Sequence, residues 1–362
     1  MSVDAAAFAR LLCGYCLDVQ PGQQVVVSSS TLAAPLLLAV QREVLAAEAW
    51  PLLRVELPGQ AESFWSAARD VHLDAVAPIT VAEARDMDAS LRIQAPHNTR
   101  ALAEVDAERL ARAARGQAPV REALLSHRWC LTVWPTPALA QQAGMGDAAF
   151  ASFVARALFL DPPDPVAAWN ELHDVQERLI ERLSRARELR IEAPGTDLVL
   201  AVEGRTWVNS DGKRNMPSGE VFTGPLEESA EGRIRFTIPT SPRDGGEVAG
   251  VELEFRGGQV VEARAERGAD VLQATLDTDP GARRLGEIGI GTNTGIDRAI
   301  GNTLFDEKIG GTVHLALGRS YPETGGTNES AVHWDLICDL RRDGRLSADG
   351  EPILVDGAFA AR

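Results

Sequence analysis

The sequence predicts an α/β protein of two domains, an N-terminal α/β domain with a mostly parallel sheet and a strand-rich C-terminal domain. Its 362 residues exceed what one hydrophobic core usually serves. Strand-like and helix-like runs alternate in the first half, which is typical of βαβ units on a parallel sheet. From residue 189 onward, short strand-like runs separated by glycine-containing turns replace that alternation.

The N-terminal domain is assigned to residues 1–188. It opens with a β-branched strand at 23–29 and an apolar helical run at 34–48 that carries Pro35 near its start, where proline is tolerated. Further strand-like runs follow between helical stretches, at 51–57, 75–79, 89–94 and 129–134. None of them leads into a dinucleotide or P-loop signature, so a nucleotide role has no support.

The C-terminal domain is assigned to residues 189–362. A charged amphipathic helix at 166–189 precedes it, and we place the boundary at the end of that helix. Four strands are then expected, at 197–202, 233–238, 251–255 and 259–265.

Charge and composition exclude several partners. The net charge is −16, which argues against nucleic acid and anionic membrane, because phosphate binding needs fields of Lys and Arg. No run approaches the roughly 18–20 apolar residues of a membrane span, and the N-terminus does not resemble a signal peptide. Four cysteines are too few for a disulfide framework in a chain of this length. We therefore expect a cytoplasmic protein.

A C-x-x-C pattern joins Cys13 and Cys16. It allows a redox pair or half of a zinc site. The pattern lies in an apolar helical run with no second pair, however, and we expect buried structural thiols.

Side chains with metal-binding chemistry gather in the last quarter of the chain. His333 and Asp335 stand two residues apart in an apolar run, so on a strand both point to one face. His314 lies in another strand-like run, and Tyr321, one of only two tyrosines, follows it. Carboxylates and imidazoles are the usual ligands of divalent metal ions. We interpret this region as the metal site of a hydrolase.

Two glutamates extend this set. Glu287 stands between glycines, which allow close approach of a metal, and Glu220 lies in a turn stiffened by Pro217 and Gly219. Together with Asp335 they supply three negative charges. One divalent ion would leave a surplus negative charge in a partly buried site, which is costly. Two ions leave one positive charge that a bridging hydroxide cancels, so the charge count favours two metals.

In their order along the chain, these motifs resemble the thermophilic-metalloprotease aminopeptidases, the aminopeptidase T, aminopeptidase S and PepS type. The resemblance covers about residues 215–335. It rests on the runs Asn215-x-Pro-x-Gly-Glu220, Gly286-Glu287, Glu307-Lys308-Ile-Gly-Gly-Thr-Val-His314 and Gly325-Gly-x-Asn-x-Ser-x-x-His333-x-Asp335.

The resemblance implies that two divalent ions (zinc, cobalt, magnesium or manganese) are bound by Glu220, Glu287, His314, Tyr321, His333 and Asp335. It also implies substrates that are peptides with a free N-terminus, removal of one residue at a time, and a homodimer. In such a reaction two ions acidify a bridging water and polarise the scissile carbonyl group.

Glu287 and Tyr321 are the candidate catalytic residues, with Glu287 as a general base. Lys308 is a candidate electrophile for the oxyanion. The alternative is that Lys308 only pairs with Asp306 or Glu307 on the surface.

Two other interpretations stay open. Some proteins of similar sequence are mononuclear iron dioxygenases that open hydroxypyridine rings, and His314, His333 and Asp335 match the facial triad of such sites. A dioxygenase would not need Glu220, Glu287 and Tyr321 as well. The other interpretation is a non-enzymatic protein with a structural ion, but structural sites are usually closed, four-coordinate and often rich in sulfur.

Overall fold

A computed structural model describes residues 3–242 and 246–360 of the chain. The chain forms two compact units, residues 1–166 with 212–217, and residues 167–211 with 218–362. The sequence-based boundary at residue 188 differs from this division because it places the long helix α10 (Pro165–Leu183) in the first domain. Leu179 and Leu183 of that helix belong to the hydrophobic core of the second unit.

The first unit is built on a five-stranded sheet in which every neighbouring pair is parallel, as predicted. In spatial order the strands are β2 (Trp50–Glu56), β1 (Gln24–Ser30), β3 (Ala89–Gln94), β4 (Arg128–Val133) and β8 (Asn215–Met216). The last of these was not expected. It comes from residues 212–217, a short segment that lies far along the chain from the rest of this unit.

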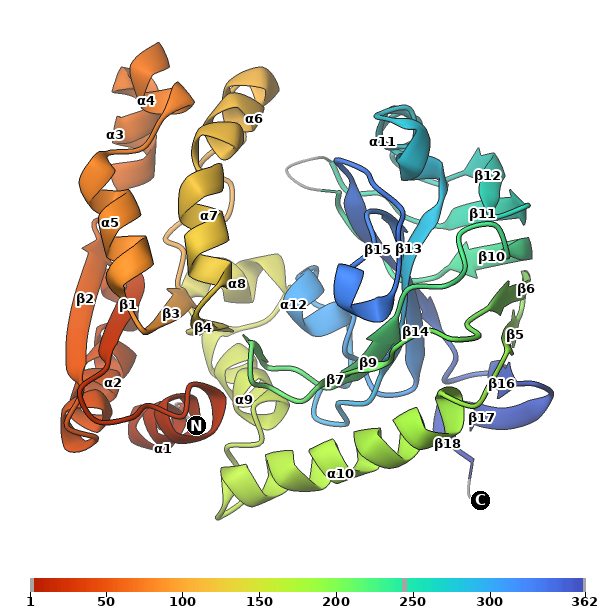
Figure 1. The fold of residues 1–362 in the computed structure, drawn as a ribbon, viewed down its shortest axis with the longest axis horizontal. Coiled ribbons are helices and arrows are strands. Elements are labelled where there is room, and N and C mark those ends of the chain that lie inside the picture. Colours follow the sequence, from red (N-terminus) through yellow and green to blue (C-terminus); the bar gives the residue numbers. More distant parts are fainter. Residues whose placement is uncertain (1–2, 243–245, 361–362) are drawn as a thin grey trace. The chain divides into compact units, whose positions relative to one another are not determined.

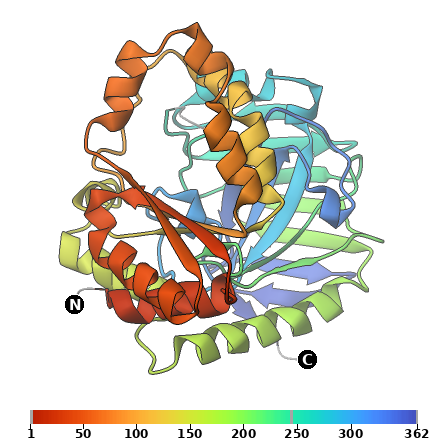
Figure 2. The same cartoon turned by 60° about the vertical axis from the view of Figure 1, so that its left-hand side comes forward.

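Helices accompany this sheet. The α2 helix (Ala34–Ala46) has Pro35 in its first turn and contacts β1 and β2 (Figures 1 and 2). Its buried Leu36, Leu37, Val40 and Val44 recur at helical spacing, so one face of the helix is apolar. The α-helices of this unit are α1 (Ala5–Arg10), α2 (Ala34–Ala46), α3 (Gln60–Ala67), α4 (Asp70–Asp74), α5 (Pro78–Asp86), α6 (Ala107–Gly116), α7 (Ala118–Leu125), α8 (Pro137–Gln142) and α9 (Asp147–Ala157).

One predicted strand is wrong. Residues 75–77 are a loop that leads into α5, which begins at Pro78. A proline at the first helical position costs no hydrogen bond there, and its fixed φ suits the helix. The short apolar run before it did not distinguish between a strand and the approach to a helix.

The C-x-x-C pattern lies in a π-helical turn, Leu11–Cys16. Both cysteines are buried, as predicted. Burial, with a smaller contribution from the charge of Glu43, raises the pKa of Cys13 to about 12. Its thiol therefore stays protonated at neutral pH, and a protonated buried thiol is unreactive.

The second unit contains two antiparallel sheets, which confirms the strand-rich prediction. The larger runs in the order β12 (Gln259–Arg264), β11 (Val251–Arg256), β10 (Glu231–Phe236), β6 (Thr196–Ala201), β5 (Glu188–Ala193), β16 (Arg345–Ala348), β17 (Glu351–Val355) and β18 (Ala358–Phe359). The smaller runs in the order β15 (His333–Asp339), β14 (Thr312–Gly318), β13 (Leu285–Gly291), β9 (Glu220–Thr223) and β7 (Val208–Ser210).

One hydrophobic core joins both sheets and α10. It combines Leu198 and Ile234 of the larger sheet with Ile288 and Leu315 of the smaller one and Leu179 of the helix. The unit also holds two shorter helices, α11 (Ala269–Leu276) and α12 (Thr303–Asp306). Within the described ranges of the chain, no helix is long and apolar enough to cross a membrane.

Candidate metal centre

The smaller sheet presents its functional side chains on one face because its strands alternate. On β14, Val313 and Leu315 belong to the core, so His314 between them points to the opposite face. On β15, Trp334 packs into the core, and its neighbours His333 and Asp335 face away from it.

Strand register brings the two glutamates to the same face. Residue 291 of β13 pairs with Glu220 of β9, and Gly289 pairs with His314 of β14. An irregularity between Leu285 and Glu287 shifts the register there and sets Glu287 opposite Ala316. Bulges of this kind re-aim side chains at active sites.

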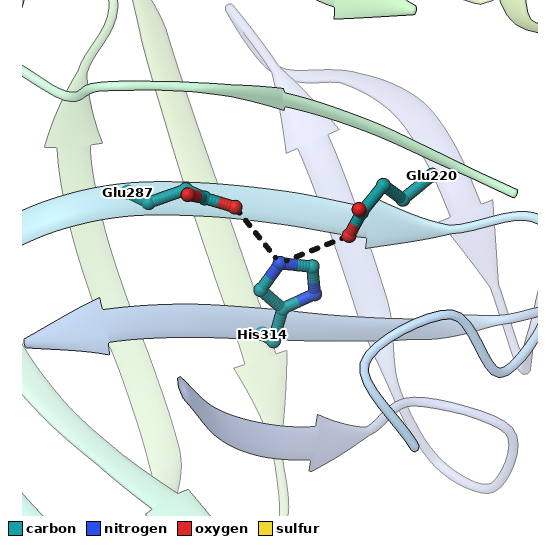
Figure 3. A group of neighbouring side chains, drawn as sticks. All are labelled: Glu220, Glu287 and His314. Carbon is teal, nitrogen blue, oxygen red and sulfur yellow. Dashed lines mark hydrogen bonds and ion pairs between the residues drawn. The ribbon is translucent and has the colours of Figure 1, made fainter. Parts of the chain in front are cut away.

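Three side chains form the centre of the cluster (Figure 3). His314 Nε2 lies 3.1 Å from Glu287 Oε1 and 3.4 Å from Glu220 Oε2. One ligand atom of each residue lies within 4.8 Å of those of the other two. The His314 side chain is fully buried, and the side chains of both glutamates are 7% exposed. The structure thus places these three predicted ligands next to one another.

His333 and Asp335 adjoin this trio through Glu287. His333 Nε2 lies 3.8 Å from Glu287 Oε2 and 3.7 Å from Asp335 Oδ1. Its Nδ1 lies 2.9 Å from the carbonyl oxygen of Arg319. A carbonyl oxygen only accepts, so Nδ1 donates and the lone pair of Nε2 faces the acids, which is the usual orientation of a metal-binding histidine.

Tyr321 lies beside this second group. The centre of its ring is 5.0 Å from that of His333 and 5.7 Å from that of Phe222. Burial and then the charges of Glu287 and Asp335 raise the pKa of its phenol, which therefore keeps its proton. All six sequence-predicted residues thus lie in one region of the second unit.

The cluster is electrostatically costly without a cation. Burial raises the pKa of both Glu220 and Glu287, and burial and the charge of Glu307 raise that of Asp335 to about 6. Burial alone would lower the pKa of His314, but its hydrogen bond with Glu287 and the charges of both glutamates raise it to about 10. A proton on His314 supplies part of the positive charge that the acids require.

The residues fit a bound divalent ion. Glu220 Oε2 and Glu287 Oε2 are buried and have no hydrogen-bond partner among the described residues. Buried carboxylate oxygens normally accept hydrogen bonds or bind a cation, and a bound metal ion would satisfy both of these oxygens. Oxygen and imidazole donors suit divalent ions, and no cysteine belongs to the cluster.

Gly289 makes room for the His314 ring. A Cβ at this position would lie 2.1 Å from His314 Cε1 and 2.2 Å from its Nε2. Gly289→Ala is therefore expected to displace the imidazole, at a cost of about 1–3 kcal/mol for overpacking, and to lower both metal content and peptidase activity. Atomic emission and a p-nitroanilide assay measure the two effects.

The matched control for this variant is Gly146→Ala. Gly146 has a φ of −74° and nothing within 4 Å of the added methyl group. If the Gly289→Ala protein bound metal as well as the Gly146→Ala protein does, the glycine would not be needed to seat the imidazole.

Lys308 differs from both of its predicted roles. It pairs with Glu307 as expected, but its side chain is fully buried rather than on the surface, and its Nζ lies 3.6 Å from Glu220 Oε1. Asp306 is not its partner and instead accepts hydrogen bonds from the backbone N–H groups of Ile300 and Asn302. A fully buried ammonium group does not reach a substrate, so the electrophile role is not supported in this conformation.

Sequence reasoning missed the support of Glu220. Gln176 of α10 is fully buried, and its Nε2 donates to the Glu220 carbonyl oxygen at 2.6 Å. Asn293 donates to the Ser218 carbonyl oxygen at 2.8 Å, and Gly219 (φ 114°) passes so close to it that a Cβ would lie 2.7 Å from the Asn293 Cβ. Neither amide stands near Glu220 in sequence, so no local pattern signals it.

Comparisons with known proteins reveal relatives of this chain. The family model described as thermophilic metalloprotease (M29) matches residues 3–359. The curated protein "Aminopeptidase 2" of Geobacillus stearothermophilus is 32% identical, over 98% of this chain and 97% of its own. "Aminopeptidase T" of Thermus aquaticus is 35% identical over 55% of this chain and 53% of its own. A solved structure, wild-type AmpT from Thermus thermophilus, superposes with a TM-score of 0.84 at 27% identity, covering 99% of both chains.

Proposed function

We propose, on the premise that this chain belongs to the thermophilic metalloprotease family (M29), that its metal-dependent aminopeptidase activity uses two divalent ions. The substrates are peptides with a free N-terminus, from which single residues are removed. Zinc, cobalt, magnesium or manganese as the metal, a homodimer and a cytoplasmic location stay predictions from the resemblance and the composition.

The position of Glu287 between the two histidines is the observation that carries the two-metal proposal. Its Oε1 faces His314 and its Oε2 faces His333, at 3.1 and 3.8 Å. Glu220 adjoins the first histidine and Asp335 the second. Two half-sites, Glu220 with His314 and Asp335 with His333, therefore share one carboxylate, and Glu287 is the proposed bridging ligand.

The bound ions would supply an activated water and polarise the scissile carbonyl group. Around them the chain's own residues hold protons and orient ligands. Tyr321 lies against the His333 ring, where its O–H would be a donor for the negative charge that builds on the carbonyl oxygen. The Arg319 carbonyl oxygen fixes the His333 ring, and Gln176 fixes the strand that bears Glu220.

A role as general base suits Glu287 poorly if it bridges, since both of its oxygens are then engaged. Glu287→Asp and Glu287→Gln would separate the two roles. Loss of metal in both variants supports bridging, and retained metal with lost turnover in Glu287→Gln supports proton transfer.

Metal removal tests the proposal as a whole. Dialysis against a chelator is expected to abolish the release of p-nitroaniline from amino-acid p-nitroanilides, and added zinc, cobalt, magnesium or manganese to restore it. The melting temperature should fall as well, because a ligand at a hundred times its Kd stabilises the folded state by about 2.7 kcal/mol. Full activity in protein shown by elemental analysis to be metal-free would refute the proposal.

The dioxygenase interpretation has no support. Its triad of His314, His333 and Asp335 leaves Glu220 and Glu287 without a role, yet these two carboxylates lie nearest to His314. The two relatives whose sequences are compared above are named as aminopeptidases.

A further inference from the structure

A fourth carboxylate borders the proposed metal site and is not among the residues assigned to the ions. Glu307 directly follows α12 and contacts Lys308 Nζ through its Oε1. The same ammonium nitrogen lies 3.6 Å from Glu220 Oε1, so the two glutamates flank one buried cation. Lys308 is fully buried, whereas the Glu307 side chain is 14% exposed, twice the value for Glu220.

The charge of Glu307 acts on the proposed ligands. After burial, it is the largest cause of the raised pKa of Asp335, and it also contributes to the raised pKa of Glu220. Among the described residues, Lys308 Nζ is the one hydrogen-bond partner of the Glu307 carboxylate, and it engages only Oε1. The other carboxylate oxygen, Oε2, has no hydrogen-bond partner among the described residues and is not fully buried. Glu307 thus combines a held oxygen with one that a ligand can reach.

An enzyme that requires a free N-terminus must recognise an α-ammonium group, and removing that group from water is costly unless an anion pairs with it. Glu220, Glu287 and Asp335 are assigned to the ions, whereas Glu307, which contacts Lys308 beside Glu220, is not. Building on the proposed function, we propose that Glu307 binds the α-ammonium group of the substrate through the carboxylate oxygen that Lys308 does not hold.

Lys308 is the positioning residue in this arrangement. Its ammonium group fixes the Glu307 carboxylate beside Glu220 and stabilises its negative charge. A carboxylate held through one oxygen has its other oxygen left to pair with a second cation.

A pair of hydroxamates that differ only in the amino group tests the proposal. Leucine hydroxamate carries the α-ammonium group, and 4-methylpentanohydroxamate lacks it. Inhibition constants are measured for both on metal-loaded wild type, Glu307→Gln and the control Glu262→Gln, whose residue is an exposed partner of Arg264. Wild type and control are expected to prefer the amino compound.

In Glu307→Gln that preference should fall about ten- to a hundredfold, as expected for the loss of a charge-assisted hydrogen bond, while binding of the desamino compound and metal content stay unchanged. KM for the p-nitroanilide should rise more than kcat falls, because the ammonium group is held in both the ground state and the transition state. Glu307→Asp keeps the charge with a shorter reach and should show a smaller loss. If the Glu307→Gln protein does not fold, the Glu307→Asp protein alone tests the inference.

Three results would overturn the inference. They are an unchanged preference for the amino compound, a preference kept while kcat collapses, which would mark proton transfer, and loss of metal, which would mark a ligand. All three results are informative only if metal-loaded wild-type protein cleaves the p-nitroanilide. A wild type that cleaves none with any of the four metals refutes the proposed function instead.

Discussion

His314→Ala is expected to abolish aminopeptidase activity and to lower metal content. The imidazole faces both Glu220 and Glu287 and is fully buried, so no water or neighbouring side chain takes its place without rearrangement. Polarisation by metal supplies several kcal/mol to such reactions, and each 1.36 kcal/mol is a factor of ten, so kcat/KM should fall about a thousandfold or more. The measurements are kcat/KM for leucine p-nitroanilide and elemental analysis of the purified variant.

The matched control is His97→Ala, which removes an exposed imidazole from the first unit. It should leave both activity and metal content at the wild-type level. If the His314→Ala protein kept two ions and more than a tenth of the activity, His314 would not be a ligand.

Lys308→Met should produce the largest loss of stability of any single change discussed for this protein. The methionine fills a similar volume but leaves the buried Glu220 and the partly buried Glu307 without the cation that both contact. Removing one partner from a buried charge pair costs about 3–5 kcal/mol. Urea unfolding of metal-free protein measures the free energy directly, and added metal should recover part of the loss because it supplies positive charge.

Arg264→Met provides the control, since it removes the same charge from a side chain that is 75% exposed and paired with Glu262. Exposed pairs contribute about 0–1 kcal/mol. Equal stabilities of the Lys308→Met and Arg264→Met proteins would show that the buried ammonium group does not stabilise the fold.

Much of the site could be predicted because short-range periodicity determines it. His333 and Asp335 share a strand face by their spacing alone, and Trp334 between them belongs to the core. The parallel sheet of the first unit was predicted from alternating strand-like and helix-like runs. The strand-rich second unit was predicted from the point in the sequence at which short strand-like runs replace that alternation. Only the family resemblance predicted that Glu220 lies near His314. No local pattern predicts it, because it depends on the pairing of β9 with β13, which lie about seventy residues apart in the chain.

Other features depend on tertiary contacts that no local pattern reports. The burial of Lys308 follows from the packing of the segment after α12. Its acidic neighbours in the sequence do not predict this burial, because such neighbours are also typical of a lysine on the surface. Gln176 supports Glu220 from a helix 44 residues earlier. The strand β8 joins the parallel sheet from residues 215–216, which their Pro/Gly-rich surroundings indicate only as a turn.

Anomalous diffraction at the metal absorption edge, from crystals grown with saturating zinc, tests the central claim most directly. We predict two peaks in each chain, one at Glu220 and His314 and the other at His333 and Asp335, with the carboxylate of Glu287 reaching both. A single peak, or two peaks that leave Glu287 outside the coordination of either ion, would contradict the two-metal site.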